Sequence, residues 1–230
     1  AILLQGTRTK QVSPGVKHHM QFIDKEHTIH HFPPGPRTST GSHAGVAIII
    51  NNKMLPRSAL RKSFEATDDI AGRAGAVRYV TKTRDVTFLT LYPPPPSSTH
   101  AADTVRRIAR WLDTTLSALP ARTIPIVGID MNGRVGRGHN IDITDTIGNC
   151  QPDDVTANSI PFVEVFIKHE MCILNTYVRC GPTYYGNASS SRIDFLVAPR
   201  TCRLPDNMNR TFVAQAAGDR LQLGTTAQRW

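Results

Sequence analysis

The chain of 230 residues is long enough for one globular domain of upper-middle size, and its 40% hydrophobic and 20% charged content is that of a folded protein. This composition excludes a disordered chain, and no apolar run approaches the ~20 residues that a bilayer span needs, so we expect no membrane contact. Lysine and arginine outnumber aspartate and glutamate by 27 to 18, and this surplus of +9 favours a polyanionic partner over a merely basic surface.

The N-terminal part of the chain predicts two strands separated by a long loop. Residues 1–5 are apolar enough for a strand, whereas residues 7–42 are rich in histidine, proline and glycine and are expected to be mostly loop. The run "AGVAIII" (44–50) predicts a buried strand, which the turn signal of residues 51–53 should end. Ala1 stands directly inside an apolar run, so we expect the true start of the domain to lie upstream.

The histidines and cysteines give little support for a metal site. The stretch "EHTIHH" could bring three imidazoles around a metal, but no thiolate or carboxylate set accompanies them, and we favour a solvated loop; these residues are His27, His30 and His31. The four cysteines have no CxxC pair and no zinc-like spacing, which is typical of a reduced intracellular protein. They are Cys150, Cys172, Cys180 and Cys202.

The middle of the chain predicts a hairpin, a proline loop and a helix. "AGAVRYVTKT" (74–83) and "VTFLTLY" (86–92) are two strands joined at Arg84-Asp85. Four prolines (93–96) then forbid further strand pairing. A helix should then run from Ser98 and Thr99, which can cap it, to about residue 119. It should have one apolar stripe, formed by Val105, Ile108, Leu112, Leu116 and Leu119. Its polar face should carry arginines, which are Arg106, Arg107 and Arg110.

The rest of the chain alternates strands and one further helix. "TIPIVGID" (123–130) is a strand, residues 131–158 are polar, and a helix is expected over 160–170. Further strands are expected at "MCILNT" (171–176), at "SRIDFLVA" (191–198), and near 211–215 and 220–223. Hairpin-linked strands that alternate with single helices predict an α+β fold with two sheets packed face to face and helices outside.

The stretch "GIDMNG" raises the first question of chemistry. Side chains two apart in a strand share a face, so Asp130 and Asn132 should project together at the carboxyl end of a buried strand, where α/β folds tend to place ligands. A turn explains the pattern about as well, because Asn132-Gly133 is a good hairpin signal. An EF-hand loop fits less well, since the glycine comes too early.

Two more stretches favour a site over a turn. Tyr92 ends a strand just before the proline loop, although a strand-end aromatic would explain Tyr92 alone. Asp194 stands inside an apolar strand, where a carboxylate is costly to bury unless a partner pairs with it. An ion pair with Arg192 is the structural alternative for Asp194.

The order of motifs resembles the endonuclease/exonuclease/phosphatase superfamily. The motifs span nearly the whole chain in the family order, and the resemblance is greatest to the apurinic-type endonuclease domain of non-LTR retrotransposons; they are "LLQGT", "GVAIII", "LTLYPPPP", "PIVGIDMNG", "LNTY…PTYY" and "SRIDFLV". The resemblance implies a single domain over residues 1–230 with a two-sheet sandwich flanked by helices, in four layers α/β/β/α.

The resemblance also implies roles for four residues. Asp130 matches the aspartate that positions or deprotonates the attacking water and contributes to the metal site, and Asn132 matches the asparagine that contacts the scissile phosphate. Tyr92 matches the tyrosine that hydrogen-bonds the same phosphate, and Asp194 matches the carboxylate that orients a catalytic histidine. Phosphate-ester hydrolysis needs a hard cation, an oriented water and hydrogen-bond donors, so Mg²⁺ or Mn²⁺ is the expected cofactor.

The departures from the family pattern concern the metal and the histidine. Gly6 stands where the family has a metal-binding glutamate, unless Gln5 or Asp24 substitutes for it. The chain has no histidine after His169, and we expect the family's closing Asp-His pair to lie past Trp230, which makes this a domain truncated at both ends.

The resulting prediction is a magnesium-dependent endonuclease that nicks DNA as part of a retroelement polyprotein with a reverse transcriptase, in the nucleus. One alternative is a catalytically dead remnant that still binds nucleic acid, and the departures favour a feeble or inert enzyme. Another alternative is a phosphatase of the same superfamily, since the core motifs do not fix the substrate.

Overall fold

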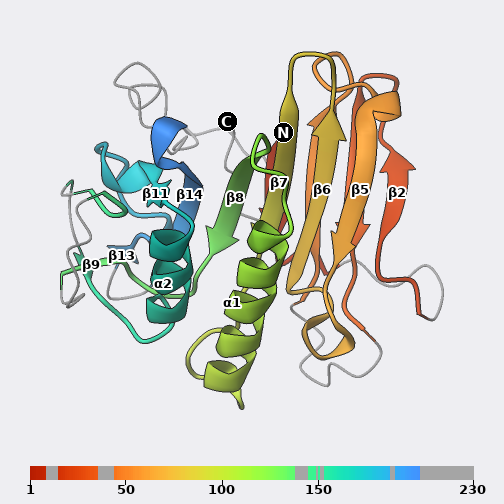
Figure 1. Cartoon of the computed structure of the whole chain (residues 1–230). Coiled ribbons are helices and arrows are strands. Elements are labelled where there is room, and N and C mark those ends of the chain that lie inside the picture. The colour runs from red at the N-terminus through yellow and green to blue at the C-terminus, as the bar shows by residue number, and fades with distance from the viewer. Residues whose placement is uncertain are drawn as a thin grey trace.

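Two β-sheets packed face to face form the centre of the protein, and two α-helices cover one outer face (Figure 1). The computed structural model describes residues 1–8, 15–35, 44–137, 145–148, 150, 153–186 and 190–202. The strands expected near 211–215 and 220–223 lie outside the described residues.

The larger sheet has six strands in the order β11-β14-β8-β7-β6-β5. Only β7 and β8 run parallel, and every other neighbouring pair is antiparallel. The parallel pair brings the ends of β7 and β8 to one edge of the sheet. The strands are β5 (Leu60–Glu65), β6 (Ala74–Val80), β7 (Asp85–Leu91), β8 (Ile124–Asp130), β11 (Met171–Ile173) and β14 (Asp194–Pro199).

The smaller sheet has four antiparallel strands in the order β1-β4-β3-β2. They are β1 (Ile2–Gln5), β2 (His19–Phe22), β3 (His27–Phe32) and β4 (Val46–Asn51). Two minor pairs of strands also form: β9 (Gly136–Arg137) with β10 (Asp153–Asp154), and β12 (Tyr184–Tyr185) with β13 (Ser190–Ser191). Short 3₁₀ helices are η1 (Arg57–Ala59), η2 (Asp68–Ile70), η3 (Leu174–Thr176) and η4 (Arg200–Cys202).

Apolar side chains fill both interfaces of this arrangement. Between the sheets, buried residues such as Leu3, Ile48 and Val77 form one cluster. Between the six-stranded sheet and the helices α1 (Ala101–Ser117) and α2 (Ile160–Lys168), a second and larger cluster forms. Four residues of the predicted stripe belong to it from α1, and Leu119, which follows the helix, packs against it. Burial on this scale, at roughly 25 cal/mol per Å² of apolar surface, is the main term that holds the layers together.

The two-sheet α+β sandwich that the sequence predicts is confirmed. The hairpin of β6 and β7 closes at residues 81–84, where the Thr81 amide donates to the Arg84 carbonyl at 2.7 Å. Both α-helices of the described residues lie on the six-stranded sheet, so a helix layer over the four-stranded sheet is not among them (Figure 1). No helix in the described ranges is both long and apolar enough to cross a bilayer.

The N-terminal segment differs from its prediction, because β2 and β3 lie where residues 7–42 were expected to be mostly loop. Alternate residues of β3 point inward, and one of them is the fully buried His30. Its Nε2 atom lies 2.8 Å from the Tyr79 hydroxyl and its Nδ1 atom 3.1 Å from His18 Nε2. Burial lowers the pKa of His30 to about 4, so a neutral imidazole serves as a core residue of the strand.

Candidate active site

Four polar residues occupy neighbouring positions across four adjacent strands, at the end toward which β8 runs. Asp194 of β14 lies directly opposite Asp130 of β8. Tyr92 follows Leu91, which pairs with Ile129, so Tyr92 lies beside Asp130. Arg73 precedes Ala74, which pairs with Leu91, so Arg73 lies beside Tyr92. We call Arg73, Tyr92, Asp130 and Asp194 the polar row; at about 4.8 Å per strand it spans roughly 14 Å.

All four side chains of the polar row face the four-stranded sheet. Their neighbours along the strands belong to the cluster beneath the helices, and successive side chains of a strand point to opposite faces. Those neighbours are Ala74, Leu91, Ile129 and Phe195. The polar row therefore lies at one end of the interface between the two sheets.

Asp130 and Asp194 face each other in the closer of the two kinds of antiparallel pair. The Met131 amide donates to the Ile193 carbonyl at 2.8 Å, which makes Asp130 and Asp194 a non-hydrogen-bonded cross-strand pair. In such pairs the Cα atoms are only about 4.5 Å apart and the side chains are closest. Like charges opposite each other are destabilising, so the fold has brought together two carboxylates that repel when both are ionised.

Burial raises the pKa of both carboxyl groups. Asp194 is only 6% exposed, and its repulsion raises the pKa of Asp130 further. A hydrogen bond from the Asn132 amide to Asp130 Oδ1, at 2.9 Å, lowers the pKa of Asp130 in part, and Thr183 does the same for Asp194. The pair therefore either holds a proton or holds a cation, because both satisfy the same repulsion.

Tyr92 lies between the acidic pair and Arg73. Burial and the two nearby carboxylates raise the pKa of its hydroxyl, and Arg73 and Arg8 oppose this effect without cancelling it. The phenol therefore remains protonated at neutral pH and can donate a hydrogen bond to an anion.

Asn132 lies beside Asp130 for a reason that differs from the predicted one. The strand ends at Asp130, and Asn132 adopts a left-handed backbone conformation with φ of 44°, so strand alternation does not aim the two side chains together. The Asn132 amide instead turns back to Asp130, and its Nδ2 atom donates to the Pro93 carbonyl at 2.9 Å. The proline loop thus positions the carboxamide.

Gly6 lies against Tyr92, at the wall of the same site. A Cβ atom built on Gly6 would lie 3.6 Å from the Tyr92 ring and hydroxyl, in ordinary contact, but the φ of +63° at this position disfavours any other residue. The neighbouring Gln5 carboxamide donates to Thr90 Oγ1 at 3.0 Å. β1 reaches this position because Gly128 lacks a side chain where Leu3 crosses β8.

Asp24 cannot replace the missing glutamate. It lies in the turn between β2 and β3, where its carboxylate accepts hydrogen bonds from the Glu26 and His27 amides. His27 pairs with Asn51 at one end of β4, whereas Gln5 pairs with Val46 at the other. The length of β4 therefore separates Asp24 from the polar row, by about 17 Å.

The ion pair between Asp194 and Arg192, the structural alternative for Asp194, is not among the ion pairs of the described residues. The Arg192 guanidinium donates to the carbonyls of Asn175 and Cys150, at 2.6 Å and 3.1 Å. His169 Nε2 lies 2.7 Å from Asp113 Oδ1, next to the strand end where β11 begins. In the ranges that the structure describes, the hydrogen bonds of Asp194 involve Asn175 and Thr183 and no histidine.

Three buried side chains that the sequence did not single out fix the loops around the site. Asn158 donates to the carbonyls of Pro94, Met131 and Asn132, which ties the proline loop to the segment after β8. Asn175 and Thr183 bind the backbone of β14 at Asp194. An asparagine or threonine in a polar stretch gives no local signal of such a role.

The donor set of the acidic pair fits a hard divalent cation. Mg²⁺ is commonly bound by one or two carboxylates together with waters and substrate phosphates, which is what Asp130 and Asp194 can offer. Within the described ranges, no group of three or more histidine, cysteine, aspartate or glutamate side chains could hold a metal ion. Among the described residues, Asp130 and Asp194 are the two carboxylates that such a site could use.

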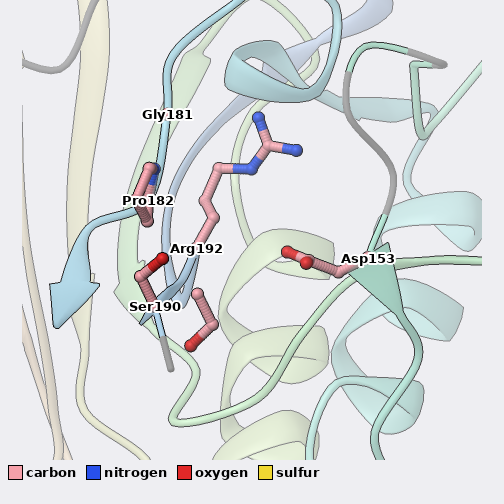
Figure 2. A pocket seen from close by; sticks show the side chains of 6 residues that line it. Asp153, Gly181, Pro182, Ser190 and Arg192 are labelled. Carbon is pink, nitrogen blue, oxygen red and sulfur yellow. The ribbon is translucent and has the colours of Figure 1, made fainter. Parts of the chain in front are cut away.

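A small polar cavity of about 150 Å³ lies beside the segment that leads into β14 (Figure 2). Asp153 faces Arg192 and Ser190 across it, and Gly181 and Pro182 also line it. None of the four residues of the polar row lines this cavity. Its Arg192 is already bonded to backbone carbonyls, so the cavity gives no reason to move the candidate site.

No known family profile and no curated protein matches this sequence. Among solved structures, the chain is similar to the endonuclease domain of TRAS1, a telomere-specific non-LTR retrotransposon, with 17% identity over 74% of this chain and 67% of that one, at a TM-score of 0.42. It is also similar to an endonuclease/exonuclease/phosphatase family protein from Leptotrichia buccalis (13% identity, 77% and 60% coverage, TM-score 0.44).

A third similar structure is a β-hairpin deletion mutant of β toxin from Staphylococcus aureus, with 12% identity, 76% and 66% coverage, and a TM-score of 0.45. A protein of the superfamily that the motif order indicates is thus among the structures that this chain is similar to.

Proposed function

We propose that the polar row is the active centre of a phosphodiesterase that hydrolyses phosphate esters in the DNA backbone. The observation that supports this most is the meeting of Asp130, Asp194 and the Tyr92 hydroxyl at one end of three adjacent strands. Carboxylates that can hold a cation or take a proton, next to a donor for a phosphoryl oxygen, are the groups that this reaction needs.

Each residue has a role that follows from its surroundings. Asp130 positions the attacking water, and its ionised carboxylate accepts the proton. Tyr92 donates to a phosphoryl oxygen, and Asn132, whose side chain donates to the Pro93 carbonyl, would contact the same group. Asp130 and Asp194 would hold Mg²⁺ or Mn²⁺ between them, and the ion would supply charge to stabilise the phosphoryl oxygens.

This proposal gives Asp194 a role that the family resemblance does not imply. With no histidine beside it in the described ranges, Asp194 would help Asp130 to hold the cation instead of orienting an imidazole. The position opposite Asp130 in a non-hydrogen-bonded pair supports this role.

The observation at Gly6 favours a second candidate function, that of a remnant which binds nucleic acid without cleaving it. No carboxylate stands at Gly6, and Gln5 donates its side-chain amide to Thr90. Losing one preorganised group of an active site often costs ~10²–10³ in rate. We therefore expect slow hydrolysis from the first candidate and none from the second.

The experiment is nicking of supercoiled plasmid by the 230-residue chain, with Mg²⁺ or with a chelator. The proposal predicts open-circular product that requires the metal and disappears in Asp130→Asn. Metal-independent nicking, or nicking that Asp130→Asn retains, would contradict the assignment. Turnover of a small phosphate ester without plasmid nicking would indicate a phosphatase, and binding without either reaction would indicate the remnant.

Binding to DNA should be weakly specific and strongly dependent on salt. The net charge of +9 supports this expectation, because phosphate contacts release counterions and the affinity falls steeply between about 50 and 200 mM salt. Fluorescence anisotropy with duplexes of unrelated sequence would measure it. A flat salt titration would exclude DNA as the partner and, with it, the retroelement, nuclear and reverse-transcriptase context that the resemblance implies.

A further inference from the structure

Arg73 is a buried cation at the end of the polar row. It is only 6% exposed, and its guanidinium carbon lies 5.2 Å from the centre of the Tyr92 ring. One terminal nitrogen donates to the Tyr92 carbonyl at a long 3.4 Å. The guanidinium therefore lies on the same face as Tyr92, on the side away from Asp130 and Asp194.

Within the described ranges, no carboxylate forms an ion pair with Arg73. Arg78, five residues later on β6, shows the usual arrangement, because its Nε and a terminal nitrogen bind Asp85 at 2.9 Å and 2.7 Å. A guanidinium offers five N–H donors in a fork that matches carboxylate and phosphate groups. Burying it without an anion is costly, and a cation–π contact with Tyr92 offsets only part of that cost.

The charges along the polar row are separated. Two carboxylates stand at one end, the neutral Tyr92 hydroxyl lies in the middle, and Arg73 stands at the other end with Arg8 near enough to influence Tyr92. By strand spacing, Arg73 is about 10 Å from Asp130. A ligand that complements the charges of the polar row therefore carries one negative charge next to Tyr92 and another next to Arg73.

We infer that Arg73 binds a phosphate of the substrate next to the one that is cleaved, and so lays the nucleic-acid strand along the polar row. This inference rests on the proposed function and names a positioning residue for it. Arg73 would hold the neighbouring phosphate through its fork, whereas Tyr92 and Asp130 would face the reacting one. A single phosphate ester would use only half of the row.

The test compares three variants in binding a short single-stranded thymidine oligonucleotide, with a chelator present so that hydrolysis plays no part. Arg73→Met should bind about ten- to a hundred-fold more weakly. It should also flatten the slope of log affinity against log salt by about 0.7, the value of one lost contact to a single strand. Arg73→Lys keeps the charge without the fork and should fall between wild type and Arg73→Met.

Arg84→Met is the matched control, since it removes the same charge from an exposed position in the hairpin at the opposite end of β6 and β7. It should leave both affinity and salt slope close to wild type. A neutral methylphosphonate oligonucleotide should bind wild type and Arg73→Met equally. Equal affinity and slope for Arg73→Met and Arg84→Met would overturn the inference.

A second measurement separates binding from a structural role. Inorganic phosphate, compared with chloride at equal ionic strength, should raise the thermal midpoint of wild type and not that of Arg73→Met. Without phosphate, Arg73→Met should unfold no earlier than wild type, because an unpaired buried charge has been removed. If Arg73→Met has a lower thermal midpoint than wild type, and phosphate still raises that midpoint, then Arg73 only supports Tyr92.

The two proposals can fail separately. Plasmid nicking that requires Asp130, together with unchanged binding by Arg73→Met, would refute the role of Arg73 and leave the function in place. Loss of binding and of the phosphate shift in Arg73→Met, without any hydrolysis by wild type, would support the Arg73 site and refute the hydrolase.

Discussion

Replacing Asp130 with asparagine should stabilise the folded chain and at the same time remove its hydrolytic activity. Most single substitutions destabilise a protein, and those at the end of a core strand are among them. Here the sign reverses, because Asp130 faces Asp194 in the closest type of cross-strand pair and both carboxyl groups are buried. An asparagine removes the repulsion and offers N–H donors to Asp194.

The pH dependence of this gain follows from the direction of the shifts. Folding raises the pKa of both carboxyl groups, so the folded state holds their protons more tightly than the unfolded state. The free energy of unfolding therefore decreases as the pH rises from about 4, the ordinary carboxyl value, through the folded values. The advantage of Asp130→Asn should be absent near pH 4 and complete above neutral pH.

The same pKa shifts determine how much stability Asp130→Asn gains. Each unit by which the pKa is raised corresponds to about 1.4 kcal/mol, which in a chain of this length shifts the thermal midpoint by roughly 3–6 °C. Thermal unfolding with a chelator at the two pH values measures it. The plasmid assay should show a loss of at least ~10²-fold, and Mg²⁺ should stabilise wild type but not the variant.

Asp69→Asn provides the matched control. Asp69 is an exposed aspartate, paired with Arg107 at 3.2 Å, and its pKa is lowered by hydrogen bonds, chiefly from Thr67. This substitution should bring no gain in stability and no loss of activity. If Asp130→Asn unfolds earlier than wild type above neutral pH, the repulsion between Asp130 and Asp194 is not what governs this pair.

The sequence predicted most of the six-stranded sheet because its strands are apolar runs that are flanked by turn residues or prolines. The four-stranded sheet was harder, since β3 reads HTIHHF and places Thr28 and His30 in the core. A polar residue can take such a position only when a partner satisfies it, and for His30 that partner is Tyr79, far away in the sequence. Local composition cannot reveal such a pair.

Some residues of the candidate site could likewise be predicted from the sequence, and one could not. Asp130, Tyr92 and Asp194 could be named because each is a polar residue at the end of, or inside, an apolar strand, and their adjacency follows only from the strand register. Arg73 was missed because an arginine before a strand is ordinary in a sequence. Its burial, and the lack of an acidic partner within the described ranges, become visible only in three dimensions.

Replacing Asp85 with alanine should be the most destabilising of the substitutions considered, although Asp85 takes no part in the proposed chemistry. It begins β7, at the opposite end of the sheet from the polar row. Its side chain is 8% exposed and accepts hydrogen bonds from Arg78, from Arg122 at 2.9 Å and from Thr123 at 3.0 Å. These partners, of which Arg78 has the largest effect, hold the pKa of Asp85 well below its usual range.

The expected loss is on the order of 3 kcal/mol, because Arg78 is left 16% exposed and without its anion. Folding lowers the pKa of Asp85, so its contribution to the free energy of unfolding is present above about pH 4 and is lost as the pH falls toward the folded value. The free energies of unfolding of wild type and Asp85→Ala should therefore converge in acid. Urea unfolding at several pH values measures the difference, and plasmid nicking by the folded fraction should be unchanged.

Two further variants make this prediction specific to the buried pair. Arg122→Ala removes a partner that is 74% exposed and should cost at most about 1 kcal/mol. Adding Arg78→Met to Asp85→Ala should recover much of the stability, because the uncompensated cation is gone. If the double variant is no more stable than Asp85→Ala, the loss comes from the hydrogen bonds that Asp85 accepts and not from the charge left on Arg78.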